Sequence, residues 1–181
     1  MPAAPAAIWT IGHSTRTLEA FLGLLDGHRI EAVADVRRFA GSRRCPHFAG
    51  AALAESLPRH GLIYRWLPQL GGRRKVQPGS PNTAWRNASF QGYADFLATA
   101  EFAGGLAELL QLAASRRTAM MCAEAVWWRC HRALVSDVLK LRGIRVMHIV
   151  DAGAATEHPY TSPARIVQGR LSYAPAAADP P

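Results

Sequence analysis

The sequence predicts an α/β fold, namely a single-domain, Rossmann-like three-layer sandwich around a mainly parallel sheet of about five strands. The first observation is that five short apolar runs alternate with segments whose apolar residues recur at helical spacing. The second is size, because 181 residues with 49% hydrophobic content suit one domain with a full core. We therefore expect one domain over residues 1–174 and a disordered Pro- and Ala-rich tail over residues 175–181.

The first half of the chain is expected to contain three strands and two helices. Thr17 is a suitable N-cap for the first helix, in which apolar residues from Leu18 to Leu25 recur on one helical face. Residues 39–48 are rich in glycine, arginine and proline, which favours a loop. The expected elements are strands at 8–12, 32–36 and 62–67, a helix from residue 18 to near residue 27 and a helix at 50–59.

The second half is expected to begin with a long irregular stretch at residues 69–89, of the kind that forms a functional lid or a disordered loop. The glycine pair at 104–105 is expected to interrupt the helical pattern, and Gly143 is a suitable C-cap. The expected elements are helices at 90–97, 106–113 and 130–141 and strands at 118–122 and 146–150. After residue 151 the chain becomes polar and Pro-rich.

Polar side chains gather where the expected strands end. In parallel α/β sheets the ligand crevice lies at the carboxyl ends of the strands. The first, second and fourth strand ends should therefore share one rim and build the site. The residues at or just after strand ends are His13, Asp35, Arg37, Cys122, Glu124 and, at the end of the last strand, His148 and Asp151.

The densest group of reactive side chains lies in residues 118–132, which read T-A-M-M-C-A-E-A-V-W-W-R-C-H-R. A helix start lowers the pKa of a thiol, so Cys130 is a candidate reactive thiolate. Cys122 ends a strand, where a cysteine also serves as a small buried hydrophobic residue. Neighbours on a helix point about 100° apart, so at most two of Cys130, His131 and Arg132 are expected to face one ligand.

A divalent metal ion is a candidate cofactor, with Cys122, Glu124, Cys130 and His131 as candidate ligands. Their spacing lacks the paired C-x2-C or H-x3-H pattern of structural zinc sites. Adjacent residues at a helix start also rarely reach one ion together. A structural role for these residues therefore stays open beside metal binding.

Asp35 and Glu124 are the candidate general bases. Asp35 with Arg37 reads either as a simple ion pair or as part of a site in which Arg37 clamps an anion and a carboxylate activates water. His13 and Ser14 follow the first strand, where they either cap the next helix or form an anion site.

The charge favours a phosphate-bearing partner. The net charge is +8, and all but two of the 21 basic residues are arginine, whose planar fork suits phosphate oxygens. Codon bias in a GC-rich genome would give the same composition. Basic clusters at 37–38, 43–44 and 73–75 follow the second and third strands, and the aromatic residues Trp85, Phe90 and Tyr93 could stack on unpaired bases.

The cysteine count and the lengths of the apolar runs indicate the cellular compartment. Three cysteines are an odd number without the spacing of a disulfide framework, which favours reduced thiols. The apolar runs are too short to span a membrane, and the first residues lack the basic and apolar regions of a signal peptide. We expect a cytoplasmic protein without membrane contact, and the oligomeric state stays open.

Seven ordered motifs together resemble the bacterial and archaeal "domain of unknown function 488" family. They are T-I-G-H-S at 10–14, A-D-V-R at 34–37, L-G-G-R-R at 70–74, F-Q-G-Y-A at 90–94, M-C-A-E at 121–124, C-H-R at 130–132 and H-I at 148–149. The Trp127-Trp128 pair is a departure from that pattern. The resemblance implies that the motif positions belong to the site, namely His13, Ser14, Asp35, Arg37, Gly71, Gly72, Tyr93, Cys122, Glu124, Cys130, His131 and Arg132.

The leading hypothesis is a hydrolytic enzyme directed at a nucleic acid or nucleotide. In it Glu124, Asp35, Cys130 and His131 carry the chemistry, while His13, Ser14, Arg37, Arg73, Tyr93 and Arg132 bind the substrate. The first alternative is a non-catalytic nucleic-acid-binding module with a structural Cys-Glu-Cys-His network. The second is thiol chemistry on a small anion.

Overall fold

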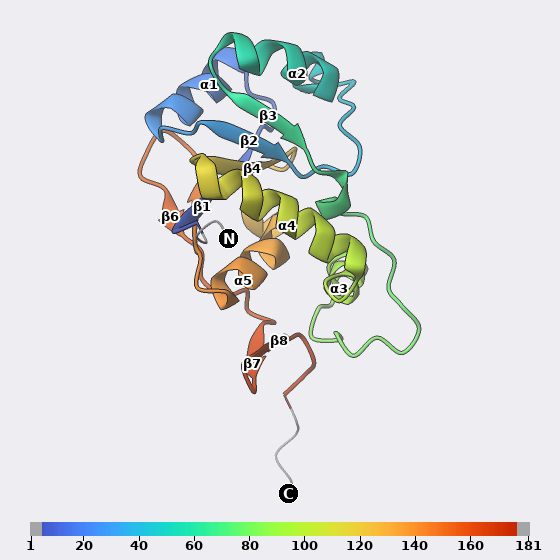
Figure 1. Cartoon of the computed structure of the whole chain (residues 1–181). Helices are drawn as coiled ribbons and strands as arrows, with labels where there is room; N and C mark the ends of the chain where they lie inside the picture. Colours follow the sequence, from blue (N-terminus) through green and yellow to red (C-terminus); the bar gives the residue numbers. More distant parts are fainter. Residues whose placement is uncertain (1–4, 177–181) are drawn as a thin grey trace, which may run out of the picture.

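A six-stranded sheet runs through the centre of the computed structural model, which describes residues 5–176 of the chain. The strand order is β3-β2-β4-β1-β5-β6, with β6 antiparallel to β5 and every other pair parallel. The strands are β1 (Ala7–Gly12), β2 (Ala32–Asp35), β3 (Ile63–Trp66), β4 (Thr118–Cys122), β5 (Arg145–Ile149) and β6 (Thr156–Glu157). The predicted Rossmann-like α/β fold with a mainly parallel sheet is confirmed (Figure 1).

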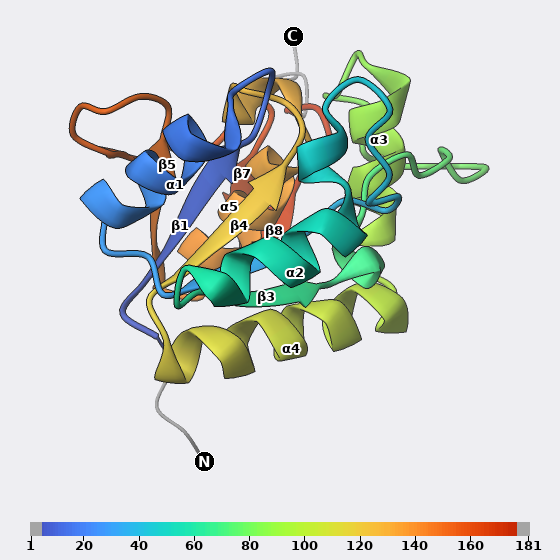
Figure 2. The same cartoon turned by 90° about the horizontal axis from the view of Figure 1, so that it is seen from above.

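Helices cover both faces of this sheet and complete the three layers, as Figures 1 and 2 show from two directions. One face carries α1 (Leu18–Gly27) and α2 (Gly50–Arg59), and the other carries α3 (Ala88–Phe96), α4 (Ala100–Ser115) and α5 (Arg132–Leu141). Short 3-10 turns η1 (Pro46–Phe48), η2 (Pro68–Leu70) and η3 (Trp127–Arg129) join some of these elements.

The central strands are apolar on both sides, and this is why their runs are continuous in the sequence. In β2, Val33 packs into the core beneath α1 and α2, while Ala34 packs into the core beneath α4 and α5. In β4, Met121 packs into the core beneath α1 and α2, and Met120 packs into the core beneath α4 and α5. Side chains alternate across a strand, so two buried faces require an unbroken apolar run.

The predicted break at the glycine pair 104–105 is wrong, because α4 runs through it from Ala100 to Ser115. The Thr99 side chain caps the helix by accepting a hydrogen bond from the Phe102 amide. Gly105 brings the helix against η2, where an added Cβ would lie 2.9 Å from the Cβ of Gln69. This glycine therefore serves close packing and does not end the helix.

The segment after β5 contains elements that the sequence did not predict. Besides β6, a small hairpin forms from β7 (Arg165–Val167) and β8 (Arg170–Ser172), with its turn at Gly169. Tyr173, next to β8, is buried in the core beside α5. Of the predicted tail at 175–181, residues 177–181 lie outside the described residues.

Among the described residues, no single helix is both long enough and apolar enough to cross a membrane. The bent pair α3 and α4 passes that test jointly, by length and composition only.

Candidate functional site

A cavity of about 590 Å³ opens at the carboxyl ends of β1, β2 and β4. β1 and β4 are neighbours, and the helices that follow them, α1 and α5, lie on opposite faces of the sheet. This is the switch point at which parallel α/β sheets hold ligands. The residues that line the cavity are His13, Arg37, Arg38, Phe39, Gly41, Ser42, Gly72, Arg73, Asn87, Ser89, Phe90, Tyr93, Cys122, Ala123, Arg129, Cys130 and His131.

The end of β1 is held closely against the loop that follows β4. The amide of His13 donates to the carbonyl of Cys122 at 2.9 Å, and the amide of Ser14 donates to the carbonyl of Ala123 at 3.0 Å. A Cβ on Gly12 would lie 1.9 Å from the carbonyl oxygen of Glu124, so only glycine permits this approach. These contacts place the His13 ring on one wall of the cavity, where it stacks on Phe48 at 4.4 Å.

The end of β2 carries a buried ion pair. Arg37 donates from Nε to Asp35 Oδ1 at 2.8 Å and from Nη2 to Oδ2 at 2.6 Å. Tyr64 donates to the same Oδ2 at 2.7 Å, so both carboxylate oxygens are occupied. Arg37 also reaches His13, with Nη1 3.2 Å from Nε2. Asp35 therefore holds Arg37 in one orientation against the cavity.

His13 is kept neutral by its surroundings. Burial lowers the pKa of His13, and the charge of Arg37 acts in the same direction. Its Nδ1 lies 2.8 Å from the carbonyl of Ser14, so Nδ1 carries the proton and Nε2 accepts from Arg37. Neither ring nitrogen is left to take up a proton from a substrate.

Two thiols and an imidazole form the floor of the cavity. Cys122 ends β4, and Cys130 and His131 precede α5. The Sγ atoms of the two cysteines and a ring nitrogen of His131 all lie within 4.8 Å of one another. The described residues hold no disulfide between these cysteines, since both are free thiols.

Cys130 is the thiolate of this pair. Burial alone would raise its pKa, but the hydrogen bond from Cys122 and the charge of Arg132 bring the pKa well below its ordinary value. The hydrogen bond to Cys130 and burial raise the pKa of Cys122 well above its ordinary value. The charge therefore resides on Cys130 and the proton on Cys122.

Arg132 lies behind Cys130 and away from the cavity. Its side chain is 1% exposed, and its Nε donates to Cys130 Sγ at 3.1 Å while its backbone amide donates to the same sulfur at 3.4 Å. Its Nη2 donates to the carbonyl of Glu124. Among the described residues no carboxylate forms an ion pair with Arg132, so the Cys130 thiolate is its counterion.

His131 is oriented from behind by the backbone. Its Nε2 lies 2.9 Å from the carbonyl of Val36, so Nε2 is the protonated nitrogen and Nδ1 is a free acceptor. That Nδ1 lies 3.9 Å from Cys130 Sγ. Gly72 passes beside the ring, where an added Cβ would lie 2.9 Å from Nδ1. The missing side chain at Gly72 keeps the space in front of this nitrogen clear.

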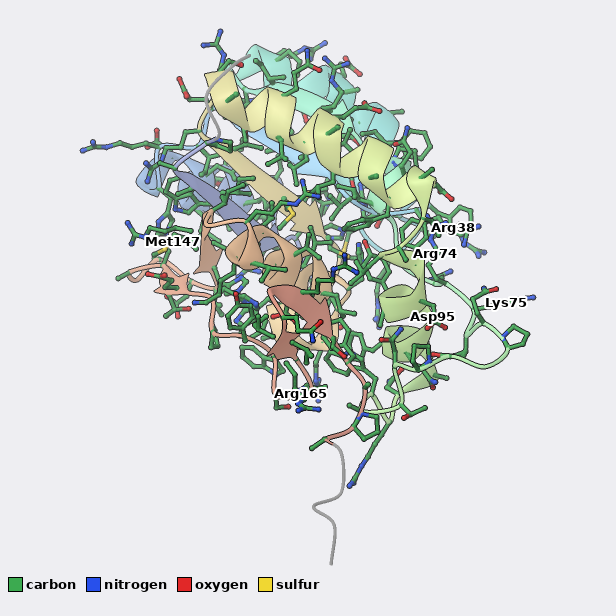
Figure 3. All side chains as sticks on the ribbon, turned by 60° about the horizontal axis from the view of Figure 1, so that its bottom comes forward. Arg38, Arg74, Lys75, Asp95, Met147 and Arg165 are labelled. Carbon is green, nitrogen blue, oxygen red and sulfur yellow. The ribbon has the colours of Figure 1, made fainter. Side chains whose placement is uncertain are left out.

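The loop between β3 and α3 forms another wall. Arg73 reaches the cavity, whereas Arg74 anchors the loop by donating to Glu101 at 2.9 and 3.0 Å and to the carbonyl of Gly71 at 3.0 Å. Farther along, Asp95 accepts hydrogen bonds from three groups of the same loop, at 2.6 to 2.8 Å. Figure 3 shows Asp95 on α3 next to the loop that carries Lys75. This stretch, which the sequence predicts to be either a functional lid or a disordered loop, is thus held by hydrogen bonds near its start and in its middle.

Comparison with known proteins gives one family. A family model described as "Domain of unknown function DUF488" matches residues 17–139. The chain belongs to this family. The matched residues include all of the cavity lining except His13. No curated protein and no solved structure matches the chain.

The DUF488 chain brings most of the predicted site residues to one cavity. His13, Arg37, Arg73, Tyr93, Cys122, Cys130 and His131 line it. Three others act behind the wall, because Asp35 binds Arg37, Arg132 binds Cys130 and the backbone of Ser14 joins β1 to the β4 loop. The Glu124 side chain is exposed and is not part of the lining, although its carbonyl accepts from Arg132.

Some lining residues had no signal in the sequence. Phe39 and Arg129 are exposed at the cavity, Ser42 comes from a loop, and Asn87 and Ser89 lie at the start of α3. Arg129 stands directly before the C-H-R motif, which could have drawn attention to it. Residues of long loops cannot be assigned to a cavity until the loop path is known.

His148 belongs to a second, fully buried cluster and not to the cavity. Thr10 donates to His148 Nδ1 at 2.7 Å, and His148 Nε2 lies 2.9 Å from His158 Nδ1. His158 Nε2 lies 3.0 Å from Asp137, which also accepts from Thr161 and Tyr173. Trp127 stacks on His148 at 4.4 Å and an interplanar angle of 7°, which gives the tryptophan of the unusual Trp-Trp pair a packing role. Asp151, the other residue predicted for the end of the last strand, is exposed.

Proposed function

We propose that this DUF488 protein is an enzyme that hydrolyses a phosphate ester in a nucleotide or nucleic acid bound in the cavity. The observation that carries the proposal is the charge of the lining. Four arginines (Arg37, Arg38, Arg73 and Arg129) face the cavity, and among the described residues that line it none is acidic. Such a lining favours an anion of several charges, and arginine favours phosphate oxygens.

The arginines fall into two classes. Arg37 is 6% exposed and held by Asp35, so it can grip a phosphate without reordering. Arg38, Arg73 and Arg129 are exposed and line the mouth, where they can follow substrates of different length. The volume of about 590 Å³ is in the usual range for small-molecule sites and accommodates a nucleotide unit.

An exposed aromatic ring at the mouth favours a nucleobase. Phe39 is 64% exposed and lies between two arginines, with the guanidinium carbons of Arg38 and Arg73 at 5.7 and 5.9 Å from its ring centroid. An unpaired base can stack on such a ring, which contributes about 1–3 kcal/mol per base. Phosphate contacts and one stacked base together describe a nucleotide or the end of a single strand.

The reaction is placed at the floor, beside Cys122, Cys130 and His131. A water molecule attacks phosphorus and releases one proton to solvent, the ester P–O bond breaks, and the leaving oxygen takes a proton from solvent. Asp35 suits a positioning role in this scheme, because its oxygens are occupied by Arg37 and Tyr64. Glu124 does not line the cavity, so the activation of water is assigned to the floor.

The test is a substrate panel with matched arginine variants. Nucleoside phosphates and short RNA and DNA oligonucleotides are incubated with the protein, and the products are separated by chromatography. Arg73→Ala and Arg129→Ala should each weaken binding and reduce its salt dependence. Arg142→Ala removes an exposed arginine outside the cavity and serves as the control. Salt-dependent binding without products would favour the non-catalytic nucleic-acid-binding module, and the absence of both would overturn the proposal.

A further inference from the structure

We propose that Cys122, Cys130 and His131 bind a zinc ion through their two Sγ atoms and Nδ1, with the fourth ligand position open to the cavity. The ligand atoms already lie within 4.8 Å of one another, and Cys130 Sγ is 3.9 Å from His131 Nδ1. Ligand atoms around a tetrahedral zinc ion lie about 3.7 Å apart, as the usual Zn–S and Zn–N bond lengths require. Only small side-chain movements separate the two arrangements.

The backbone explains how two adjacent residues reach one ion. Cys130 is extended, with φ −142° and ψ 159°, whereas His131 is helical, with φ −57° and ψ −16°. If both residues were helical, their side chains would point about 100° apart. The change of backbone conformation between them instead turns both side chains toward Cys122.

The imidazole has the tautomer that a metal ligand needs. The carbonyl of Val36 holds the proton on His131 Nε2, which leaves a lone pair on Nδ1. A ligand histidine usually donates its other N–H to a carbonyl or carboxylate in this way. Because Gly72 has no side chain, nothing at that position covers Nδ1.

The sulfur atoms have the surroundings of metal thiolates. Two N–H groups of Arg132 donate to Cys130 Sγ, which stabilises the negative charge on sulfur. Two thiolates and one imidazole form a soft donor set that selects zinc over magnesium or manganese. Two thiolates neutralise the ion, so the buried Arg132 leaves the site positive and favours an anionic fourth ligand.

Three protein ligands and one open position characterise catalytic rather than structural zinc sites. All three ligand residues line the cavity, so the open position would face the bound substrate. This role rests on the proposed function, in which the ion would lower the pKa of the attacking water. The binding of zinc itself does not depend on the substrate and is tested without one.

The experiment measures metal content and cobalt spectra of the full chain. Elemental analysis of protein purified without added metal should give one zinc per chain. After removal with a chelator, titration with Co²⁺ should give a thiolate-to-cobalt charge-transfer band and the intense visible bands of tetrahedral cobalt. Cys122→Ser, Cys130→Ser and His131→Gln should each weaken Co²⁺ binding by at least about 100-fold, more than the loss of an outer-shell partner does.

Cys45→Ser is the matched control, because Cys45 is also a buried free thiol but lies outside the cluster. This variant should keep one zinc and the wild-type cobalt spectrum. If a ligand variant fails to fold, the wild-type spectrum decides, because charge transfer from two thiolates requires both cysteines. Iron or no metal in the wild type, or a cobalt spectrum without thiolate bands, would overturn the proposal. Zinc without any hydrolysis would leave this site standing and remove the proposed function.

Discussion

Acid should destabilise this DUF488 protein through His148, a buried histidine that the fold holds without charge. Burial is the main cause that lowers the pKa of His148 to about 2; His158 and Arg132 act in the same direction, and Cys130 partly opposes them. Both ring nitrogens have partners, because Thr10 donates to Nδ1 and Nε2 lies 2.9 Å from His158 Nδ1. A second proton on the ring would therefore break an existing hydrogen bond.

The size of the effect follows from the difference between folded and unfolded chains. The unfolded chain takes up this proton near the ordinary pKa of 6.5, and the folded protein takes it up only near 2. Because the unfolded state binds more protons in this window, the free energy of unfolding falls as pH falls, by up to about 1.4 kcal/mol per pH unit. Between about pH 7.5 and 4.5 the loss is about 2.7 kcal/mol, a large part of the usual stability of about 5–15 kcal/mol.

The assay is urea denaturation followed by circular dichroism at a series of pH values. His148→Asn should be less stable than the wild type at pH near 7.5, because it loses the stacking of Trp127 on the ring. Between about pH 7.5 and 4.5 its free energy of unfolding should nevertheless fall by about 2.7 kcal/mol less than that of the wild type, because the titrating group is gone. His60→Asn removes an exposed histidine at the end of α2 and controls for the loss of an imidazole.

The difference between the two pH profiles decides the matter. Other buried groups, such as His13, contribute equally to both proteins and cancel. If wild type and His148→Asn lose the same free energy between about pH 7.5 and 4.5, His148 takes up no proton on unfolding and the reasoning is wrong.

Three further substitutions test the packing around the site. Gly12→Ala should cost about 3 kcal/mol or more in urea denaturation, because its Cβ would meet a carbonyl at 1.9 Å, whereas Gly23→Ala in α1 has open space and should stabilise by about 0.5–1 kcal/mol. Equal changes in stability for Gly12→Ala and Gly23→Ala would contradict the close approach of β1 to the loop that follows β4. Arg132→Met should lower thermal stability by an amount typical of a broken buried charge pair, about 3–5 kcal/mol, and an unaltered melting temperature would contradict the ion pair with the thiolate. Asp95→Ala should speed trypsin cleavage of the loop before α3, since three hydrogen bonds to that loop are lost, and wild-type cleavage rates would show that these bonds do not hold it.

The fold could be predicted where apolar pattern and burial coincide. β2 and β4 contribute side chains to both cores, so their sequences are continuous apolar runs and their ends could be placed. The short strands β6, β7 and β8 are mostly exposed and carry no such pattern. The continuation of α4 through its glycine pair could not be predicted either, since Gly105 is needed for close packing against η2, a contact that the local sequence does not show.

The site could be predicted only as far as strand ends determine it. Cys122 follows directly from the end of β4, and its register opposite Gly12 brings it to His13. The roles of individual groups depend on contacts between distant segments. Asp35 is occupied by Tyr64 from β3, and His131 is oriented by Val36, and neither contact leaves a trace in local sequence.

Asp137 has a consequence for how this protein can be shortened. Its carboxylate is fully buried, and all four of its hydrogen bonds come from His158, Thr161 and Tyr173, beyond the matched family region that ends at residue 139. An expression fragment trimmed to the family boundary would leave a bare carboxylate facing the apolar interior, at a cost of several kcal/mol. The segment from His158 to Tyr173 thus fastens α5 to the rest of the fold, and a minimal DUF488 unit of this protein must extend at least through Tyr173.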